Sequence, residues 1–481
     1  MNNKLILALD QGSSSSRVLA FDGQGKVVAR SSRALDTLRP SVGLAEFDAG
    51  QLLQGQVSAL QEVLQQTAAQ EIAAISVATQ RSTVVFWDRL SGNPLAPALS
   101  WQDGRAQQET AIVNLPQEAI HQMTGLYKTP FYSAPKIMWT LKNVPQVRQA
   151  AEEGRLCIGP VGSYIIWHLT GGKVFACDPT LAQRTLLFNI STLNWDHALL
   201  EAFGVKREWL PQLKRTVDDY GFYEHQGRHI PIRACVGDQQ ASLRALRVVS
   251  GGACINYGTG AFFMRNTGHQ CHFLPGLLTS VGAQDSSGCE YLLEGPVNAC
   301  STVFAWLNEI GFSCSVEEID VLCEKATQPV QFLPALGGLG APYWDFSLSP
   351  VLSGFSPRTQ KADVLAGVVE GLAALLADIV FYAERYGIKS TEIKVSGGLS
   401  KSRALLRAQA DILQMRLLPC VEAESTAAGA AMLAAQGVGA DTSQWETLHL
   451  LPPVEPTLDP DKAEEKYRKW HQFLDWCKTK K

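Results

Sequence analysis

Two short hairpins rich in glycine and hydroxyl side chains constrain the fold more than any other feature of this sequence. The first turn, Gln11–Ser16, separates strand-like runs at Leu5–Leu9 and Arg17–Asp22. The second turn, Gly258-Thr259-Gly260, lies between two similar runs near the middle of the chain. Each forms a strand–turn–strand unit that opens one half of the chain. The repetition predicts an internal duplication of architecture, although the letters of the two halves barely match.

Alternating strand and helix patterns follow both hairpins. In the first half, helical spacing at Leu52–Gln66 precedes a buried strand at Ala73–Thr79. The second half is predicted to contain strands at Ala253–Tyr257, Phe262–Asn266, Glu392–Val395 and Leu417–Val421 and helices at Lys361–Arg385, Ser402–Gln414, Ser425–Gln436 and Pro460–Lys481. Alternation of this kind predicts an α/β fold with mainly buried sheets.

The length of the chain favours two domains. At 481 residues it is too long for a single core. The sequence has no low-complexity segment and no long linker, so we expect a hinge near residues 243–252. The predicted domains are residues 1–246 and 247–481.

Charge and composition exclude several classes of partner. A net charge of −4 and a pI near 6.2 provide no field for holding nucleic acid or an anionic membrane. No uninterrupted run of about 18 apolar residues predicts a membrane span, and the apolar stretch Leu5–Leu9 is too short for a secretory signal. Eleven cysteines without a CxxC pair suit a reducing compartment. We therefore expect a cytoplasmic protein; the sequence leaves the oligomeric state open, and a homodimer is compatible with it.

The first hairpin has the residues of a phosphate-binding turn. A carboxylate ends the strand, and the turn after it exposes backbone N–H groups and hydroxyls to an anion. The carboxylate can reach phosphate-bound Mg²⁺ directly or through water, and the arginine after the turn can offset charge on a transferring group. Taken alone, a serine-rich hairpin is more often an ordinary turn. The residues expected around phosphate are Asp10, Gly12, Ser13, Ser14, Ser15 and Arg17.

The second hairpin offers the same chemistry. Gly258 and Gly260 allow the backbone to approach a phosphate closely, and Thr259 supplies a hydroxyl. Further on, the bend Ser396-Gly397-Gly398 could admit the base and ribose of a nucleotide against bare backbone, although a simple helix-start turn has the same appearance. Two such hairpins, one for each half, predict a phosphate chain held between two domains.

Asp238 is the candidate general base. It follows the apolar run Ala234-Cys235-Val236, and α/β folds gather their active groups just beyond buried strands. Phosphoryl transfer needs a group that orients the attacking hydroxyl and accepts its proton. The alternative interpretation of Asp238 is a helix N-cap.

Two further clusters could hold a small hydroxylated ligand. Gln80-Arg81-Ser82 and Trp101-Gln102-Asp103 follow predicted strands and combine polar with aromatic groups. Each cluster alone is more often structural.

Together these motifs resemble the FGGY family of carbohydrate kinases, and within it most closely the glycerol kinase branch. The resemblance covers nearly the whole chain, including Phe131–Asn143 with Lys136 and Trp139, where Thr140 replaces the usual apolar residue. The other matching motifs are Leu9–Arg17, Thr79–Arg81, Trp101–Asp103, Gly237–Ala241, Asn256–Gly260, Gly276–Thr279, Gly340–Asp345 and Ser396–Gly398. So many ordered matches make the resemblance highly specific.

The resemblance implies two ribonuclease-H-like domains, as in actin and hexokinase, that close on a cleft. ATP would lie mainly on the C-terminal domain and a small polyol or open-chain sugar on the N-terminal one. Asp238 would be the base, and Asp10 and Asp238 would lie near Mg²⁺. Asp10, Ser14 and Arg17 would face the transferring phosphate, and Thr259 and Gly260 would hold the triphosphate. Gly397, Gly398 and Ser402 would lie near the adenosine. The residues that would line the alcohol pocket are Gln80, Arg81, Trp101, Asp238, Gln239 and Phe262.

The sequence departs from the glycerol kinase pattern on both sides of the expected cleft. Ser82 stands where glutamate is typical, and Phe131 where tyrosine is typical, with Tyr132 next to it. In the expected ATP site, Ser301 replaces a typical glycine and Ala305 a typical glutamine. Ser82 and Phe131 remove groups that hydrogen-bond glycerol in the resembling enzymes, so we expect glycerol to be a poorer substrate than a longer polyol or ketose.

Three alternatives remain open at this stage. One is a true glycerol kinase that makes glycerol 3-phosphate. A second is a regulatory or sensor protein that keeps the cleft without catalysis. The presence of Asp10, Arg17 and Asp238 argues against it, because a silent homologue has no chemical need for all three. The third is an actin-like ATPase with a protein partner, which the aromatic residues Trp101 and Phe262 disfavour.

Overall fold

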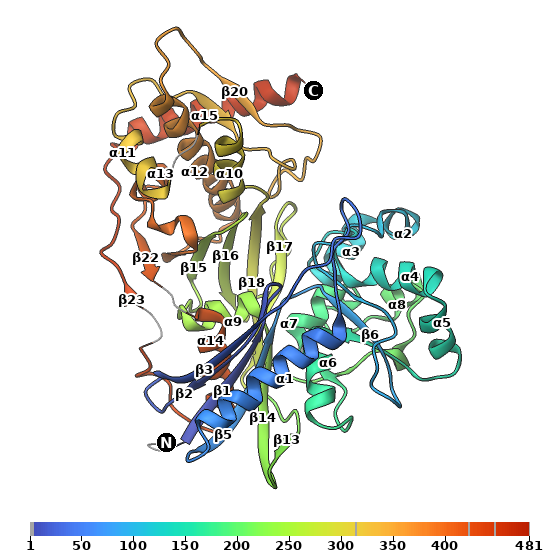
Figure 1. The fold of residues 1–481 in the computed structure, drawn as a ribbon. Helices are drawn as coiled ribbons and strands as arrows, with labels where there is room; N and C mark the ends of the chain where they lie inside the picture. The colour runs from blue at the N-terminus through green and yellow to red at the C-terminus, as the bar shows by residue number, and fades with distance from the viewer. Residues whose placement is uncertain (1–3, 313–314, 422–423, 447–448, 481) are drawn as a thin grey trace.

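The structure, a computed structural model, describes residues 4–312, 315–421, 424–446 and 449–480. Two large mixed sheets form its framework, and each sheet belongs mainly to one half of the chain. Figure 1 shows the C-terminal sheet under a group of helices and the N-terminal sheet beside a second, mostly helical lobe. The α/β class and the duplicated architecture predicted from the sequence are confirmed.

The N-terminal sheet places three parallel strands side by side at its centre. Its strand order is β13-β14-β5-β1-β2-β3, with β13 at Phe222–His225. The meander consists of β1 (Lys4–Gln11), β2 (Ser15–Phe21) and β3 (Val27–Ala34), while β5 (Glu71–Thr79) and β14 (Arg228–Gly237) run parallel to β1. Thr79 pairs with Gln11 on one side and with Gly237 on the other. The three carboxyl ends are therefore level with one another.

The C-terminal sheet repeats this plan. Its order is β17-β18-β16-β15-β21-β22-β23. β15 (Gly252–Tyr257) and β16 (Ala261–Gly268) form the hairpin, and β21 (Glu392–Ser396) runs parallel to β15 with Asn256 opposite Ser396. The remaining strands are β17 (Leu278–Asp285), β18 (Gly288–Val297), β22 (Leu417–Val421) and β23 (His449–Leu450).

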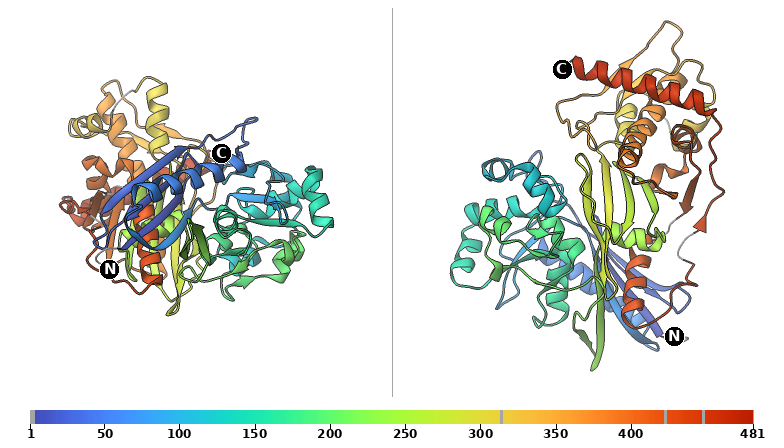
Figure 2. Two further views of the ribbon diagram at one scale, coloured as in Figure 1. Left: turned by 60° about the horizontal axis from the view of Figure 1, so that its bottom comes forward. Right: turned by 180° about the vertical axis from the view of Figure 1, so that it is seen from behind.

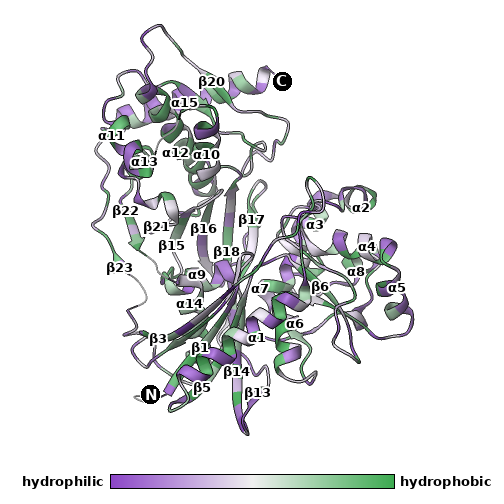
Figure 3. Ribbon diagram, viewed as in Figure 1, coloured by the Kyte–Doolittle hydropathy of each residue, from purple (hydrophilic) through white to green (hydrophobic). Residues whose placement is uncertain are grey.

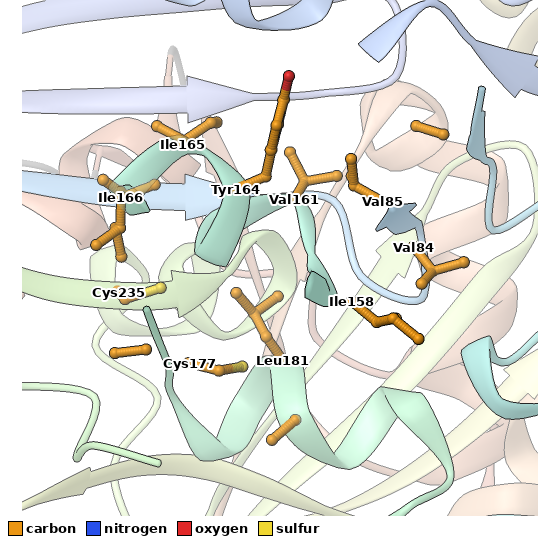
Figure 4. Packing of buried hydrophobic residues seen from close by; sticks show 14 of the residues in the cluster. Val84, Val85, Ile158, Val161, Tyr164, Ile165, Ile166, Cys177, Leu181 and Cys235 are labelled. Carbon is orange, nitrogen blue, oxygen red and sulfur yellow. The ribbon is translucent and has the colours of Figure 1, made fainter. Parts of the chain in front are cut away.

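Apart from β4, the second lobe of the N-terminal half lies between β5 and β14 in the sequence. Its small sheet contains β4 (Glu46–Phe47), β6 (Val84–Asp88), β7 (Ala98–Leu99) and β8 (Leu156–Pro160). Its helices are α2 (Gln107–Ile112), α3 (Gln117–Thr124), α4 (Ser133–Asn143), α5 (Pro145–Glu152), α6 (Val161–Leu169), α7 (Pro179–Ala182) and α8 (His197–Ala202). Side chains of this lobe and Cys235 of β14 share one buried cluster (Figure 4). This packing fixes the lobe to the central sheet.

Five helices of the C-terminal half cover its sheet on the side away from the N-terminus. They are α10 (Ser301–Glu309), α11 (Val316–Cys323), α12 (Lys361–Arg385), α13 (Arg403–Leu413) and α15 (Pro460–Thr479). The terminal helix α15 alternates polar and apolar residues and lies across the far end of this half (Figures 2 and 3). Its predicted last residue, Lys481, lies outside the described residues.

Helix α12 is the only described helix that is long and apolar enough to cross a membrane, and 89% of its most apolar window is buried. Glu370 and Asp378 interrupt that window. Asp378 accepts hydrogen bonds from Tyr343 and from two residues of α15, Tyr467 and Trp470, and the latter two tie α15 to α12. These contacts identify α12 as a core helix of the domain.

Two helices lie between the sheets and pack against each other: α9 (Asp238–Ala245) and α14 (Ser425–Gly437). They share an alanine-rich buried cluster with β1, β5 and β14. At the crossing, a Cβ atom added to Gly429 would lie 1.7 Å from the carbonyl oxygen of Ala241. The two backbones are therefore in direct contact, and no larger residue fits there.

We expect Gly429→Ala to destabilise the protein despite the better helix propensity of alanine. The clash must separate α14 from α9, and overpacking of this kind costs about 1–3 kcal/mol, against a helix gain of about 1 kcal/mol. The matched control is Gly55→Ala in α1 (Ala49–Gln66), whose nearest neighbour would be the Ser16 hydroxyl at 3.1 Å. Urea unfolding measures both variants. A Gly429→Ala protein at least as stable as Gly55→Ala would contradict the close crossing.

Candidate active site

A cavity of about 820 Å³ lies between the two halves of the chain, and both halves line it. From the first half come Ser13, Gln80, Arg81, Ser82, Trp101, Phe131, Arg184, Asp238 and Gln239. The second half contributes among others Asn256, Gly258, Thr259, Gly260, Phe262, Asn298 and Ser396. The structure thus brings the expected alcohol residues and the second hairpin together around one space.

The first hairpin is held in shape by its own backbone and by Gln80. The Gly12 N–H donates to the Ser15 carbonyl at 3.0 Å, and the Gln80 amide donates to the Gly12 carbonyl at 3.1 Å. Asp10 is buried at the end of β1 and forms an ion pair with Arg17, whose other terminal nitrogen lies 2.5 Å from Glu424. Burial raises the pKa of Asp10 to about 6, although Arg17 opposes the shift.

The second hairpin is hydrogen-bonded to the first residues of α10. The N–H groups of Cys300 and Ser301 donate to the carbonyls of Thr259 and Gly258 at 2.9 and 3.0 Å. A Cβ atom on Gly260 would lie 2.7 Å from the Val297 carbonyl oxygen, which explains the glycine. The bend after β21 is equally tight, because Gly397 has φ +91° and its Cβ would lie 2.5 Å from the Tyr257 carbonyl oxygen.

The other expected nucleotide residues lie outside the cavity lining. Gly398 faces open space, with no atom within 4 Å of an added Cβ. Ser402 is instead the N-cap of α13, and its hydroxyl donates to Asp320 at 2.7 Å. The remaining residues outside the lining are Asp10, Gly12, Ser14, Ser15, Arg17, Ser301 and Gly397.

Asp238 lies in the wall of the cavity, directly after a buried strand. It follows β14 as the first residue of α9, whose N-cap is Gly237, so the N-cap interpretation of Asp238 is wrong. Its carboxylate is 34% exposed and accepts the Gln239 N–H at 2.8 Å. Burial raises its pKa, while Arg81, 3.8 Å away, lowers it. The Gln239 N–H and the charge of Arg81 both favour the ionised carboxylate and hold its orientation.

A buried ion network behind Asp238 was not predicted from the sequence. Glu294 of β18 accepts from Arg81 at 3.1 Å and from Arg184 at 2.7 Å, and all three side chains are at most 10% exposed. Burial alone would raise the pKa of Glu294, but the two guanidinium charges lower it to about 2. Arg184 follows α7 in a region without a strong motif, and Glu294 lies in a strand of the opposite half. Only the tertiary structure brings them together.

Lys136 fixes the two loops that carry the alcohol-side residues. It is fully buried in α4, and its ammonium donates to the carbonyls of Ser100 at 2.6 Å and Ser82 at 3.2 Å. Ser82 has φ +64°, an uncommon backbone conformation that this contact helps to hold. Burial lowers the pKa of Lys136 to about 7.

The two α/β sheets of matching plan, with a cavity between them, define a two-domain fold of the actin and hexokinase type. The N-terminal domain profile of the FGGY family of carbohydrate kinases matches residues 5–244, and its C-terminal domain profile matches residues 253–438. The chain belongs to the FGGY family of carbohydrate kinases. It is therefore an enzyme that transfers phosphate from ATP to a hydroxyl of a small polyol or sugar.

Similar proteins cover the full length of the chain. A glycerol kinase from Thermus brockianus is 35% identical over 495 residues, which span 99% of each chain. A glycerol kinase from Pseudothermotoga lettingae is 37% identical, covering 98% of this chain and 97% of its own. The solved Plasmodium falciparum glycerol kinase with ADP has a TM-score of 0.93 at 26% identity, covering 99% and 98%. A xylulose kinase from Rhodospirillum rubrum has a TM-score of 0.88 at 20% identity, covers 98% of each chain, and shares the fold.

The contribution of Lys136 to stability should depend on pH. Its folded-state pKa is about 7, against about 10.4 for an unfolded lysine. Between these values the unfolded chain binds more protons, so the wild type should gain stability as the pH rises. Relative to Lys136→Met, the gain between about pH 7 and about pH 9 should approach about 1.4 kcal/mol per unit. Lys142→Met, an exposed lysine of the same helix, is the control. An unchanged difference between wild type and Lys136→Met across this range would contradict the assignment.

Proposed function

We propose that Asp238 is the general base in the transfer of the ATP γ-phosphate to an alcohol. The carboxylate takes the proton of the reacting hydroxyl, the alcohol oxygen forms a bond to the γ-phosphorus, and the bond to the β–γ bridging oxygen breaks to release ADP. Arg17 and the first hairpin face the transferring phosphate. The observation that carries this proposal is the level alignment of β1, β5 and β14, which delivers Asp10, Arg81 and Asp238 to one edge of the sheet.

Mg²⁺ would bind here to protein carboxylates together with phosphate oxygens of the nucleotide. Within the described ranges no three His, Cys, Asp or Glu side chains gather as a metal cluster. Asp10 and Asp238 are close enough that the charge of Asp238 raises the pKa of Asp10. A cation near both would relieve this repulsion, and Mg²⁺ in kinases takes one or two carboxylates together with phosphate oxygens and water. These two residues would hold the ion.

The nucleotide would lie along the second half of the cavity. Gly258, Thr259 and Gly260 would receive the phosphates, and the open space at Gly398 would receive the adenosine. Residues 1–246 and 247–481 would act as two closing domains about residues 243–252. Closure would exclude water from the phosphate and limit hydrolysis.

The substrate is a small polyol or open-chain sugar longer than glycerol. Ser82 and Phe131 line the alcohol side, and neither supplies a carboxylate or a phenol. A true glycerol kinase is the second candidate, which the full-length similarity to glycerol kinases favours. A coupled ADP-release assay over glycerol, erythritol, pentitols, ribulose, xylulose and dihydroxyacetone separates the two. If glycerol gives the highest kcat/KM of the panel, the proposal that the substrate is longer than glycerol is wrong.

Replacing Asp238 with Asn should abolish most turnover. The amide keeps the size and the hydrogen bond from Gln239 but cannot accept a proton, and loss of a general base typically costs about 10²–10⁴-fold in rate. Steady-state kinetics with saturating MgATP and the best alcohol measures kcat. Asp218→Asn, at a carboxylate outside the cavity lining, is the control. Retention of kcat within about threefold in Asp238→Asn would rule out its role as base.

A further inference from the structure

Arg17 is held by carboxylates from both halves of the chain. Arg17 and Asp10 are paired partners in β2 and β1, and one terminal nitrogen of Arg17 forms an ion pair with Asp10. The other terminal nitrogen lies 2.5 Å from a carboxylate oxygen of Glu424. Because 407 positions separate Arg17 from Glu424 in the sequence, this second ion pair depends on how the two halves are arranged.

The Glu424 carboxylate serves this contact and not its own helix. Glu424 is the N-cap of α14, but its side chain makes no capping hydrogen bond. Its backbone has φ +68°, a left-handed conformation that is uncommon outside glycine and costs free energy. The residues that cap helices well are Ser, Thr, Asp and Asn. Formation of α14 therefore does not account for a glutamate at this position, whereas the ion pair with Arg17 does.

The same end of α14 also contacts the helix that begins with Asp238. The hydroxyls of Ser425 and Thr426 lie 3.0 and 3.1 Å from the hydroxyl of Ser242, one turn after Asp238 in α9. Ser242 and Thr426 both line the cavity. The first residues of α14 thus contact the arginine beside the first hairpin and the helix of the proposed base.

Two carboxylates on different nitrogens restrict Arg17 more than one would. A guanidinium paired with a single carboxylate can rotate about that contact, whereas a second partner fixes the plane of its fork. The Arg17 side chain is nevertheless 34% exposed. Each of its terminal nitrogens carries a second N–H group, which can donate to a phosphate oxygen. The arrangement therefore holds Arg17 in one orientation and leaves it accessible to a ligand.

We propose that Glu424 is a positioning residue for phosphoryl transfer: it orients the guanidinium of Arg17 toward the phosphate and makes that orientation depend on the arrangement of the two halves. The role of Glu424 rests on the proposed function, in which Arg17 faces the transferring phosphate. Glu424 acts through Arg17 and touches neither the phosphate nor the alcohol. Its loss should therefore slow the transfer and leave binding of the alcohol unchanged.

A double-mutant cycle of Glu424→Gln and Arg17→Met tests this role. Glutamine keeps the length of the side chain and removes its charge. With Arg17 present, Glu424→Gln should lower kcat roughly tenfold to a hundredfold, because a small misplacement of a positioned group costs this much. KM for the alcohol should stay within about twofold. In the Arg17→Met background the same change should alter kcat by less than about twofold, since the residue through which it acts is gone. Transfer from γ-labelled ATP keeps slow variants measurable.

A second ion pair of the same length provides the matched control. Arg33 of β3 and Glu62 of α1 also lie 2.5 Å apart, on the surface of the first half and outside the cavity lining. Glu62→Gln removes this pair and should leave kcat unchanged. Glu424→Asp keeps the charge but withdraws it by one methylene, so it should give a smaller loss with the same dependence on Arg17. This variant carries the test if Glu424→Gln does not fold.

The possible results separate the role of Glu424 from the proposed function. A kcat within about twofold of the parent in Glu424→Gln overturns the positioning role. An equal loss with and without Arg17 also overturns it, because Glu424 would then act independently of the arginine. If Arg17→Met itself keeps kcat within about threefold of the parent, Arg17 does not face the transferring phosphate and that part of the proposed function fails as well. A large loss in Arg17→Met without one in Glu424→Gln rejects the role of Glu424 alone.

Discussion

The site depends on the register of three parallel strands. Because Gln11, Thr79 and Gly237 are paired partners in neighbouring strands, the chain leaves β1, β5 and β14 at one level. Asp10, Arg81 and Asp238 are therefore neighbours, although more than 200 positions separate the first from the last in the sequence. A shift of one residue in any of these strands would turn its side chains to the other face of the sheet. The buried apolar strands that fix this register thus also fix the chemistry.

Two of the contacts that join the halves of the molecule lie next to Asp238. The crossing of α9 and α14 is an apolar contact between small residues, and it lies directly behind Asp238. The network of Arg81, Arg184 and Glu294 is a charged contact that links a loop of the first half to β18 of the second. Removing one partner of a buried ion pair leaves the other charge buried and unpaired, which destabilises the protein. The wall of the cavity is therefore built on residues that also hold the two sheets together.

The sequence predicted the fold and about half of the cavity wall. Strong local signals, such as the apolar strands, the glycine turns at Gly258 and Gly397, and the apolar face of α12, gave the elements within a few residues. The region between β5 and β14 was left largely unassigned, because its short helices and strands have weak periodicity. Arg184 and Glu294 were missed for a different reason. Neither residue belongs to a recognisable motif in its own segment, and their ion pair forms only between the two halves of the chain. The hydroxyl of Ser402 caps α13 and donates to Asp320, and the expectation that Ser402 lies near the adenosine stays a prediction.

The central claim is that one nucleotide and one alcohol are held between both halves of the chain. Small-angle X-ray scattering tests it most directly, with the protein alone, with a non-hydrolysable MgATP analogue, and with the analogue and the best alcohol together. The account predicts a smaller radius of gyration in the ternary complex, since ligands that bridge the cavity favour the closed form. A scattering profile unchanged at saturation, in a preparation whose turnover with ATP and the same alcohol is confirmed, would contradict it.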